Sequence, residues 1–306
     1  MTDFGRVLVL FGGTSAERDV SLKSGQAVLD ALKAAGVDAE GYDPAGGLER
    51  LLKGDYQRAF IVLHGRGGED GAIQGVLEWL GKPYTGSGIL ASALCMDKAR
   101  TKQVWVAAGL PTAESRVISR GQHDWAGLLD GLGGDVAVKP VCEGSSIGIQ
   151  RAQDPETLEA ACADAWRYDD RVLLERWIVG KEYTVAILGD RALPVIRMET
   201  DHAFYDYEAK YLADDTRYFI PCGLSKAEER TMQKLALDAA KACGCKGWGR
   251  VDIMRDNAGN NWLLEVNTVP GMTDHSLVPM AAAHAGMDFQ ALCLAILETS
   301  RLKEES

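Results

Sequence analysis

Hydrophobic residues near the start of the chain alternate between strand-like runs and helical spacings. The run from Arg6 to Phe11 is mainly apolar, a glycine turn follows, and helical spacing of apolar residues continues to Gly36. A second apolar run, 59–63, leads into the glycine-rich segment 64–71 and another helical pattern. Strands alternating with helices predict a small parallel sheet. Because ligands bind beyond the carboxyl ends of such strands, we expect loops 12–17 and 64–71 to face one crevice.

The pattern changes after residue 96. The next stretch combines helices to about residue 108 and from 155 to about 168 with strands near 136–139 and 172–175. Residues 182–198 then alternate in polarity around a Gly-Asp turn, which predicts an antiparallel hairpin. We therefore divide the chain into three domains, covering 1–96, 97–180 and 181–306.

A long connection rich in aromatic residues covers about 199–223 of the third domain. Connections of this length are usually lids or binding loops, and we interpret this one as a lid. Ser225 and Glu228 then match the capping-box pattern of a helix start, so a helix is predicted from there to about Cys243.

A second predicted hairpin gathers polar side chains on one face. Asp252 and Glu265 are equidistant from the midpoint between Ala258 and Gly259, and so are Arg250 and Asn267. Because side chains alternate along strands, these four would share one face, while the core face would contain Val251, Ile253, Leu264 and Val266. Opposed carboxylates repel unless a cation lies between them, and with an amide oxygen they suit magnesium. A solvated face with neutralised charges is the alternative.

Composition narrows the class of protein. Hydrophobic residues make up 46% of the 306 residues and charged residues 25%, which is ordinary for globular domains. The formal charge of -11 disfavours broad contact with nucleic acid or an anionic membrane. No apolar run is long enough to cross a bilayer and the start of the chain is not signal-like, so we expect a cytoplasmic protein. Seven scattered cysteines indicate reduced thiols rather than a disulfide framework.

The segment 138–148 places Lys139 at a strand end before a loop of small residues, which could cradle phosphate. An ordinary turn is the competing interpretation. Lys98 and Lys210 are further candidate phosphate ligands, although isolated lysines are usually solvated. Glu175 is either a nucleotide contact or a buried strand end. Cys142 lies inside the loop, and we hypothesise that ATP binding is sensitive to thiol-modifying reagents because a cationic phosphate site favours its thiolate. An inert small residue is the simpler interpretation.

Six ordered motifs resemble those of the D-alanine–D-alanine ligase family and cover nearly the whole chain. They are Gly12-Gly-Thr-Ser-Ala-Glu-Arg18, His64-Gly-Arg-Gly-Gly-Glu-Asp-Gly71, Lys139-Pro140 with Glu143-Gly-Ser-Ser146, Tyr205-Asp-Tyr-Glu-Ala-Lys-Tyr211, Gly247-Trp-Gly-Arg-Val-Asp252 and Glu265-Val-Asn-Thr-Val-Pro-Gly-Met-Thr273. The resemblance implies the ATP-grasp fold, with ATP between two α+β domains behind an N-terminal parallel-sheet, Rossmann-like substrate domain. It also implies that ATP activates one D-alanine as an acyl phosphate, which the amine of a second D-alanine attacks during peptidoglycan precursor synthesis.

The resemblance assigns a role to each matching residue. It implies that ATP is bound by Lys98, Lys139, Ser146, Glu175, Trp177, Ile178, Glu182 and Lys210. It implies two Mg²⁺ (or Mn²⁺) ions on Asp252, Glu265 and Asn267. Lys210 would reach the transferred phosphate when the lid closes over a chamber poor in water.

The remaining roles concern the two amino acids. Glu17 would anchor the ammonium group of the first D-alanine, with His64 close by, while Ser276 and the N–H of Leu277 would bind the second carboxylate. Arg250 and the N–H of Gly271 would stabilise the oxyanion of the tetrahedral intermediate. Tyr211 would join Glu17 and Ser145 in a hydrogen-bonded triad. Both Tyr211 and a phosphate oxygen are conceivable acceptors for the amine proton. A helix-start carboxylate and a structural histidine are the plainer interpretations of Glu17 and His64.

Other functions fit parts of the sequence. A ligase that makes D-alanyl-D-lactate would share the fold, but the resemblance implies that such ligases replace this tyrosine, so Tyr211 favours an amine nucleophile. A nucleotide-binding regulator without turnover is disfavoured by the intact Lys210, Arg250 and Asp252. A dinucleotide oxidoreductase is disfavoured because Gly12-Gly13 lacks the G-x-G-x-x-G spacing. The resemblance implies D-alanine and ATP as small-molecule partners and a homodimer formed through the N-terminal domain.

Overall fold

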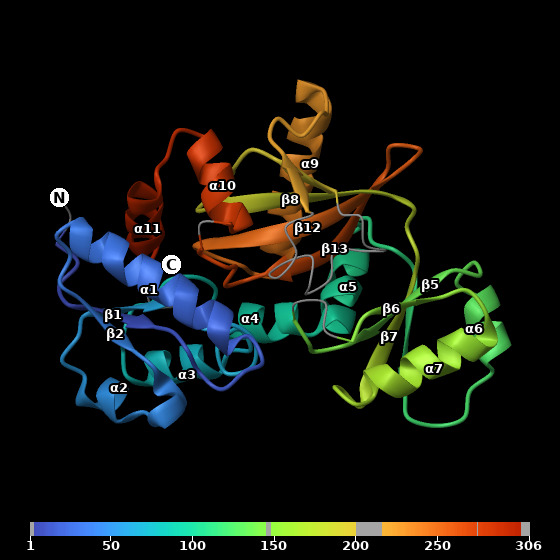
Figure 1. Cartoon of the computed structure of the whole chain (residues 1–306), viewed down its shortest axis with the longest axis horizontal. Coiled ribbons are helices and arrows are strands. Elements are labelled where there is room, and N and C mark those ends of the chain that lie inside the picture. The colour runs from blue at the N-terminus through green and yellow to red at the C-terminus, as the bar shows by residue number, and fades with distance from the viewer. Residues whose placement is uncertain (1–2, 145–147, 200–215, 274, 301–306) are drawn as a thin grey trace.

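The computed structural model describes residues 3–144, 148–199, 216–273 and 275–300, and three sheets lie along its long axis (Figure 1). At one end, β1 (Val7–Leu10) pairs in parallel with β2 (Ala39–Tyr42) and β3 (Arg58–Ile61). The helices of this part are α1 (Arg18–Ala34), α2 (Glu49–Lys53), α3 (Ala72–Trp79) and α4 (Ile89–Met96), with a short 3-10 turn at Pro44–Gly46. The predicted parallel sheet is confirmed.

Strand β2 is absent from the sequence-based prediction, which passes from the first strand to residues 59–63. The reason is its composition, because only Ala39 among its four residues is buried and the strand is a polar edge. The two loops expected to share a crevice do adjoin, since the Ser15 hydroxyl donates to the carbonyl of His64 at 2.7 Å.

The middle of the chain forms an antiparallel sheet. After α5 (Lys98–Ala107), the strands β4 (Ser115–Ser119), β5 (Val136–Pro140), β6 (Gln150–Ala152) and β7 (Arg171–Arg176) take the order β4-β7-β5-β6. The helices α6 (Trp125–Asp130) and α7 (Pro155–Ala165) lie together beside this sheet (Figure 1) and share its core.

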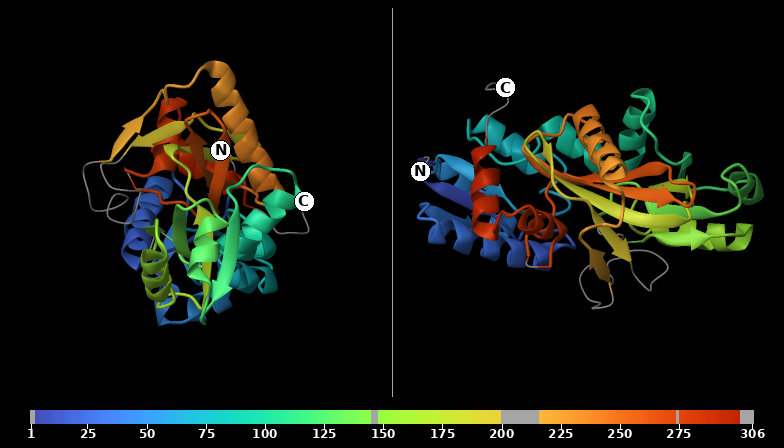
Figure 2. Two further views of the ribbon diagram at one scale, coloured as in Figure 1. Left: turned by 90° about the vertical axis from the view of Figure 1, so that its right-hand side faces the viewer. Right: turned by 90° about the horizontal axis from the view of Figure 1, so that it is seen from above.

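The third sheet is the largest of those described. Its order is β11-β10-β8-β12-β13, formed by Arg217–Phe219, Ile196–Glu199, Gly180–Leu188, Trp248–Asp256 and Asn261–Asn267, with β9 (Arg191–Ala192) also paired to β8. The hairpin predicted around Gly189 is confirmed. Helix α9 (Lys226–Ala242) covers one face, begins with the predicted Ser225/Glu228 capping box, and stands above the sheet in both views of Figure 2. Most of the segment predicted as a lid lies outside the described residues; its described ends belong to the paired strands β10 and β11.

The last two helices return to the first sheet. Helices α10 (Leu277–His284) and α11 (Phe289–Glu298) lie against the N-terminal part, where α11 packs beside α1 (Figures 1 and 2). Leu292, Ile296 and Leu297 belong to the same buried cluster as the strands β1 and β3. In the same cluster Trp248 of β12 contacts Phe60 of β3, with ring centroids 6.4 Å apart. One continuous core therefore joins the beginning and the end of the chain.

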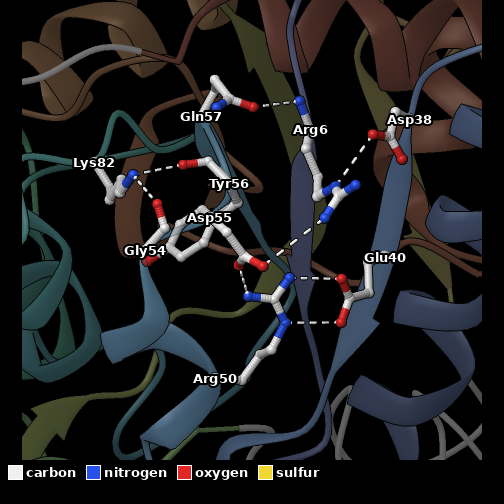
Figure 3. A network of polar contacts seen from close by, with 9 residues as sticks. All are labelled: Arg6, Asp38, Glu40, Arg50, Gly54, Asp55, Tyr56, Gln57 and Lys82. Carbon is white, nitrogen blue, oxygen red and sulfur yellow. Dashed lines mark hydrogen bonds and ion pairs between the residues drawn. The ribbon is translucent and has the colours of Figure 1, made fainter.

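A charged network lies around the amino ends of the first three strands (Figure 3). Arg50 of α2 donates two parallel hydrogen bonds to Glu40, at 2.8 and 2.6 Å, and also pairs with Asp55. Lys82 donates to the carbonyls of Gly54 and Tyr56 and lies over the Tyr56 ring. Burial raises the pKa of Tyr56 to about 12. These contacts tie α2 and the strands together at the end of the sheet away from the crevice.

No single helix in the described part of the chain is long and apolar enough to span a membrane. Helices α10 and α11 meet that test only as a pair bent by 104°. Both bury Leu, Val, Ile or Ala side chains within the protein, as core helices do.

Candidate functional site

The hairpin of β12 and β13 opposes the two predicted metal-ligand carboxylates. Asp252 pairs with Glu265 and Arg250 with Asn267, as the sequence predicts. Val251 and Val266 are buried under α9 on the other face. The polar face is therefore turned away from α9 and towards the middle domain.

A register shift after Asp252 corrects one part of that prediction. Ile253 pairs with Leu263 rather than with Leu264, so Leu263 is fully buried whereas Leu264 is only partly buried. A bulge places an extra residue, Leu264, in β13, and as a result Leu263 faces the core in its place. Simple counting from the turn cannot reveal such an insertion. The polar pairs Arg250–Asn267 and Asp252–Glu265 lie farther from the turn than the bulge, and they keep their predicted register.

Asp252 is held by donors on three strands. Arg250 donates from Nε and from a terminal nitrogen to its two carboxylate oxygens, at 2.9 and 2.8 Å. Thr184 of β8 donates at 2.6 Å and Asn267 of β13 at 3.1 Å. The residue is only 3% exposed. These donors satisfy the hydrogen-bonding capacity of a buried carboxylate and fix its orientation.

Lys98 connects this face to the middle domain. It is the first residue of α5, is 9% exposed, and its ammonium group lies 3.4 Å from a carboxylate oxygen of Glu265. The same ammonium donates to the carbonyl of Glu143 at 2.6 Å. A buried cation thus lies between the loop after β5 and the polar face of β13, where phosphate groups would find positive charge.

Lys139 and Glu175 also meet, but in a way that the sequence does not predict. Glu175 is 3% exposed and accepts ion pairs from Lys139 at 3.0 Å and from Lys102 at 2.8 Å. Burial alone would raise the pKa of Glu175, but the two ammonium groups outweigh it and lower that pKa to about 2. Burial lowers the pKa of Lys102, whereas for Lys139 the nearby carboxylates outweigh burial and raise the pKa. Lys102 was missed because no motif marks it.

The other residues predicted near ATP lie at the junction of β7 and β8. Trp177 follows β7, and Arg151 stacks over its ring at 4.7 Å from the centroid. Ile178 is buried, and Glu182 lies on β8 opposite Met198 and Met254. Glu182 and Glu265 both raise the pKa of Lys139, so these groups face one space between the middle and third sheets.

Glu17 and His64 lie together in the N-terminal crevice. Glu17 precedes α1, is 8% exposed, and approaches Gly144 so closely that a Cβ there would lie 2.7 Å from its Oε2. Nδ1 of His64 lies 2.9 Å from the carbonyl of Val269, so it carries the proton and donates it. Burial lowers the pKa of His64, although Glu17 opposes this. In the neutral ring Nε2 is an acceptor, and among the described residues it has no hydrogen-bond partner.

Glu69 is a further acidic residue of this crevice that we did not predict. It accepts from the N–H of Gly65 at 2.7 Å and, more weakly, from that of Val269 at 3.4 Å. Burial and the charge of Glu17 raise the pKa of Glu69 to about 8. Its position inside the quoted motif 64–71 was available from the sequence, but nothing there distinguished it from the neighbouring acidic residue.

The loop between β13 and α10 closes the crevice. The N–H of Met272 donates to Ser24 of α1 at 3.1 Å, which places Gly271 beside the N-terminal domain. The Ser276 hydroxyl accepts from the N–H of Thr273 at 2.9 Å, and Ser276 precedes Leu277 at the start of α10. Together with Arg250, these residues join the crevice to the polar face of β12.

Four predicted site residues, Ser145, Ser146, Lys210 and Tyr211, lie outside the described residues. The surroundings of Cys142 oppose the thiolate that the hypothesis for this residue invokes. Burial, together with Asp169 and Asp97, raises the pKa of its thiol to about 11, although Arg171 opposes this. Although a guanidinium nitrogen of Arg171 lies 3.5 Å from the Cys142 sulfur, burial and the two carboxylates outweigh its effect on the thiol pKa.

Within the described parts of the chain, no three His, Cys, Asp or Glu side chains gather to hold a metal ion by themselves. The predicted set has two carboxylates and one amide. Such a set fits magnesium that is held jointly with phosphate oxygens, because this ion usually keeps few protein ligands. The opposed Asp252 and Glu265 provide that charge.

A parallel-sheet domain followed by two α+β domains that enclose buried lysines and opposed carboxylates defines an ATP-grasp enzyme. Residues 104–298 match the family model for the C-terminus of D-Ala-D-Ala ligase, and residues 42–87 match the model for its N-terminus. The chain therefore belongs to the D-alanine–D-alanine ligase family, which confirms the resemblance stated from the motifs.

Individual relatives agree with this assignment. The chain is 61% identical over 298 residues to a D-alanine–D-alanine ligase from Ectopseudomonas mendocina, covering 97% of this chain and 95% of the relative. The crystal structure of the ligase from Bacillus anthracis superposes with a TM-score of 0.87 at 33% identity, covering 96% of this chain and 97% of that one. The VanG D-Ala:D-Ser ligase from Enterococcus faecalis gives a TM-score of 0.83 at 29% identity, covering 96% and 99%.

Proposed function

We propose that this protein uses ATP to join two D-alanines into D-alanyl-D-alanine for peptidoglycan precursors. The observation that carries the proposal is the continuity of two charged spaces. Lys98, Glu265 and Asp252 line one space between the sheets, and Arg250 connects it to the crevice that contains Glu17 and His64. A carboxylate in the crevice would therefore lie next to the phosphates of ATP.

The first step requires ATP to be held with its terminal phosphate at that junction. Lys98 and Lys139 supply positive charge, while Trp177, Ile178, Glu182 and the end of β7 at Glu175 would surround the adenosine. The Lys139 ion pair with Glu175 supports a positioning role for that carboxylate. Asp252, Glu265 and Asn267 would hold magnesium or manganese, which when bound would neutralise phosphate oxygens and polarise the phosphoryl group. Ser146 and Lys210 complete the proposed nucleotide site.

The first D-alanine would bind through its ammonium group to Glu17. The acceptor nitrogen of His64 and the protonated form of Glu69 would hydrogen-bond in the same crevice, and both are consistent with a site that has little water. Transfer of the terminal phosphoryl group to the D-alanine carboxylate gives an acyl phosphate and ADP. The acyl carbon then has a good leaving group.

The second D-alanine would bind through its carboxylate to Ser276 and the N–H of Leu277, at the start of α10. Its amine attacks the acyl carbon, and Arg250 with the N–H of Gly271 would stabilise the oxyanion that forms. Phosphate leaves with the bonding electrons, and the amine gives up its proton. Glu17, Ser145 and Tyr211 would form the hydrogen-bonded triad, and either Tyr211 or a phosphate oxygen would accept the proton.

The three-domain division at residues 96 and 180 remains part of this proposal, as does a lid formed by about 199–223. We also propose a cytoplasmic location and a homodimer. All seven cysteines are free thiols, which supports a reducing compartment. Trp79 on α3 and Leu90 on α4 are 93% and 77% exposed, which supports a dimer surface on the N-terminal domain. Sedimentation of Trp79→Ala at several concentrations would test the dimer; an unchanged monomer fraction would contradict this surface.

Product analysis tests the central proposal. Purified protein is incubated with ATP, magnesium and D-alanine, alone and with excess D-lactate or D-serine, and the products are separated by mass. We expect ADP, phosphate and D-alanyl-D-alanine. Glu265→Ala is expected to abolish the dipeptide, while Glu156→Gln, an exposed carboxylate on α7, serves as the matched control. ATP binding without any dipeptide or mixed product from the wild type would contradict the ligase proposal.

A further inference from the structure

Three cysteines from distant parts of the chain meet behind the polar face of the sheet. Cys95 lies on α4, and Cys243 and Cys245 follow α9. The sulfur atoms of Cys95 and Cys245 are 3.5 Å apart although the residues are 150 positions apart in sequence. That separation is already van der Waals contact, so a bond of about 2.05 Å requires a shift of only about 1.5 Å.

Cys243 is the third, buried cysteine of this cluster. It is 2% exposed and is hydrogen-bonded to Cys95. This bond raises the pKa of Cys95 and lowers that of Cys243, which is also polarised by Trp105.

Exposure distinguishes the two bonding partners. Cys95 is 6% exposed, whereas Cys245 is partly exposed and can be reached from solvent. The surrounding segments are already in contact, since the N–H of Lys246 donates to Ser87 at 3.2 Å. A bond between the sulfurs would join neighbours rather than draw separate parts together.

We propose that Cys95 and Cys245 form a reversible disulfide when the protein meets a small-molecule disulfide. The Cys245 thiolate attacks the reagent, forms a mixed disulfide and releases one thiol. The Cys95 sulfur then attacks the Cys245 sulfur as its proton passes to the departing reagent sulfur, which leaves as the second thiol. One reagent disulfide is reduced to two thiols as the two cysteines lose two electrons and two protons.

The position of the crosslink gives it a consequence for the site. Cys95 is three residues before Lys98, and Cys245 is five residues before Arg250. The disulfide would fix the start of α5 against the start of β12. On the basis of the proposed function, we expect the KM for ATP to differ between the oxidised and reduced protein.

The test uses oxidised glutathione on the full-length protein, followed by thiol counting under denaturing conditions and peptide mapping. We expect two of the seven thiols to disappear, the intact mass to fall by two hydrogen atoms, and one linked peptide to contain Cys95 and Cys245. Dithiothreitol should restore all thiols. Cys245→Ser should prevent the crosslink, whereas Cys142→Ser, which removes another partly exposed thiol, should still form it.

Other products would overturn the assignment. A stable glutathione adduct on Cys245, a Cys95–Cys243 bond, an intermolecular crosslink, or no thiol loss would each contradict the proposed pair. An unchanged KM for ATP in crosslinked protein would contradict the coupling to the site. Because the crosslink is read by mass, its failure is distinguishable from failure of the ligase proposal, which is measured on reduced protein.

Discussion

Two arginine–carboxylate pairs in this protein have nearly the same geometry and very different surroundings. Arg50 with Glu40 and Arg250 with Asp252 each form two parallel hydrogen bonds of 2.6 to 2.9 Å. The arginine side chains are 13% and 12% exposed. The side chain of Glu40 is 45% exposed, whereas the side chain of Asp252 is only 5% exposed. Burial of the carboxylate is the difference.

The surroundings separate a structural pair from a pair in a functional site. Glu40 faces water, and its arginine has a second acidic partner in Asp55 (Figure 3). Asp252 instead lies opposite Glu265, with Lys98 beyond it, so charges from two domains converge on one face. Geometry alone would not distinguish these pairs. The concentration of buried charge marks the functional site, because it costs free energy that a fold would otherwise avoid.

The largest expected effect is on a buried carboxylate beside the site. Glu175→Gln leaves Lys102 and Lys139 without their shared counter-charge, and we expect a loss of roughly 3–5 kcal/mol in unfolding free energy. Glu40→Gln, the exposed counterpart, should cost only about 0.2–1 kcal/mol. Urea unfolding of both variants measures the contrast. Equal costs would show that burial does not separate the two networks.

A second test addresses function. Arg250→Lys keeps the positive charge but removes the planar pair of donors, so we expect kcat to fall about 100- to 1,000-fold because oxyanion stabilisation weakens. Arg50→Lys is the matched control and should leave kcat unchanged. Steady-state rates with ATP and D-alanine provide the measurement. Similar kcat values for both variants would remove Arg250 from the proposed chemistry.

The pH dependence sharpens the comparison further. The pKa of Glu175 is lowered from 4.5 to about 2, so its stabilisation is fully present above about pH 4.5 and is lost as the pH falls towards 2. The difference in melting temperature between wild type and Glu175→Gln should therefore shrink as the pH falls from about 4.5 towards 2. A difference that stays constant over this range would contradict a buried, ionised Glu175.

The smallest effect is expected in the exposed network. Arg50→Met should reduce the unfolding free energy by about 1 kcal/mol, because its partners remain hydrated when it is removed. Asp38→Asn, at a still more exposed pair with Arg6, should have no detectable effect. Urea midpoints and product formation measure both variants. A large loss of activity in Arg50→Met would mean that this network also serves the site.

The sequence predicts those features that depend on local periodicity. The alternating pattern around Ala258 and Gly259 correctly opposes Asp252 and Glu265, because side-chain alternation fixes which residues face each other. The pattern fails between Asp252 and the turn, where a bulge makes Leu263 rather than Leu264 the residue that pairs with Ile253 and faces the core. It also misses β2, because a short polar edge strand has no apolar repeat.

Long-range partners were less accessible to prediction. Lys102 pairs with Glu175, and Cys95 meets Cys245, through contacts that no local spacing encodes. Glu69 lies inside a recognised motif, but its raised pKa arises from burial and from Glu17, which belongs to another loop. The surroundings of Glu69 become visible only when the loops after β1 and β3 and the loop before α10 are brought together in space.

The shared core of the first sheet with α10 and α11 has a consequence for biosynthesis. A ribosome makes the N-terminal strands first, yet the side chains of Leu292, Ile296 and Leu297 that complete their core are synthesised last. The N-terminal domain therefore cannot bury its apolar surface fully until almost the entire chain has emerged. Until then the nascent chain has an exposed hydrophobic face, a natural binding surface for chaperones.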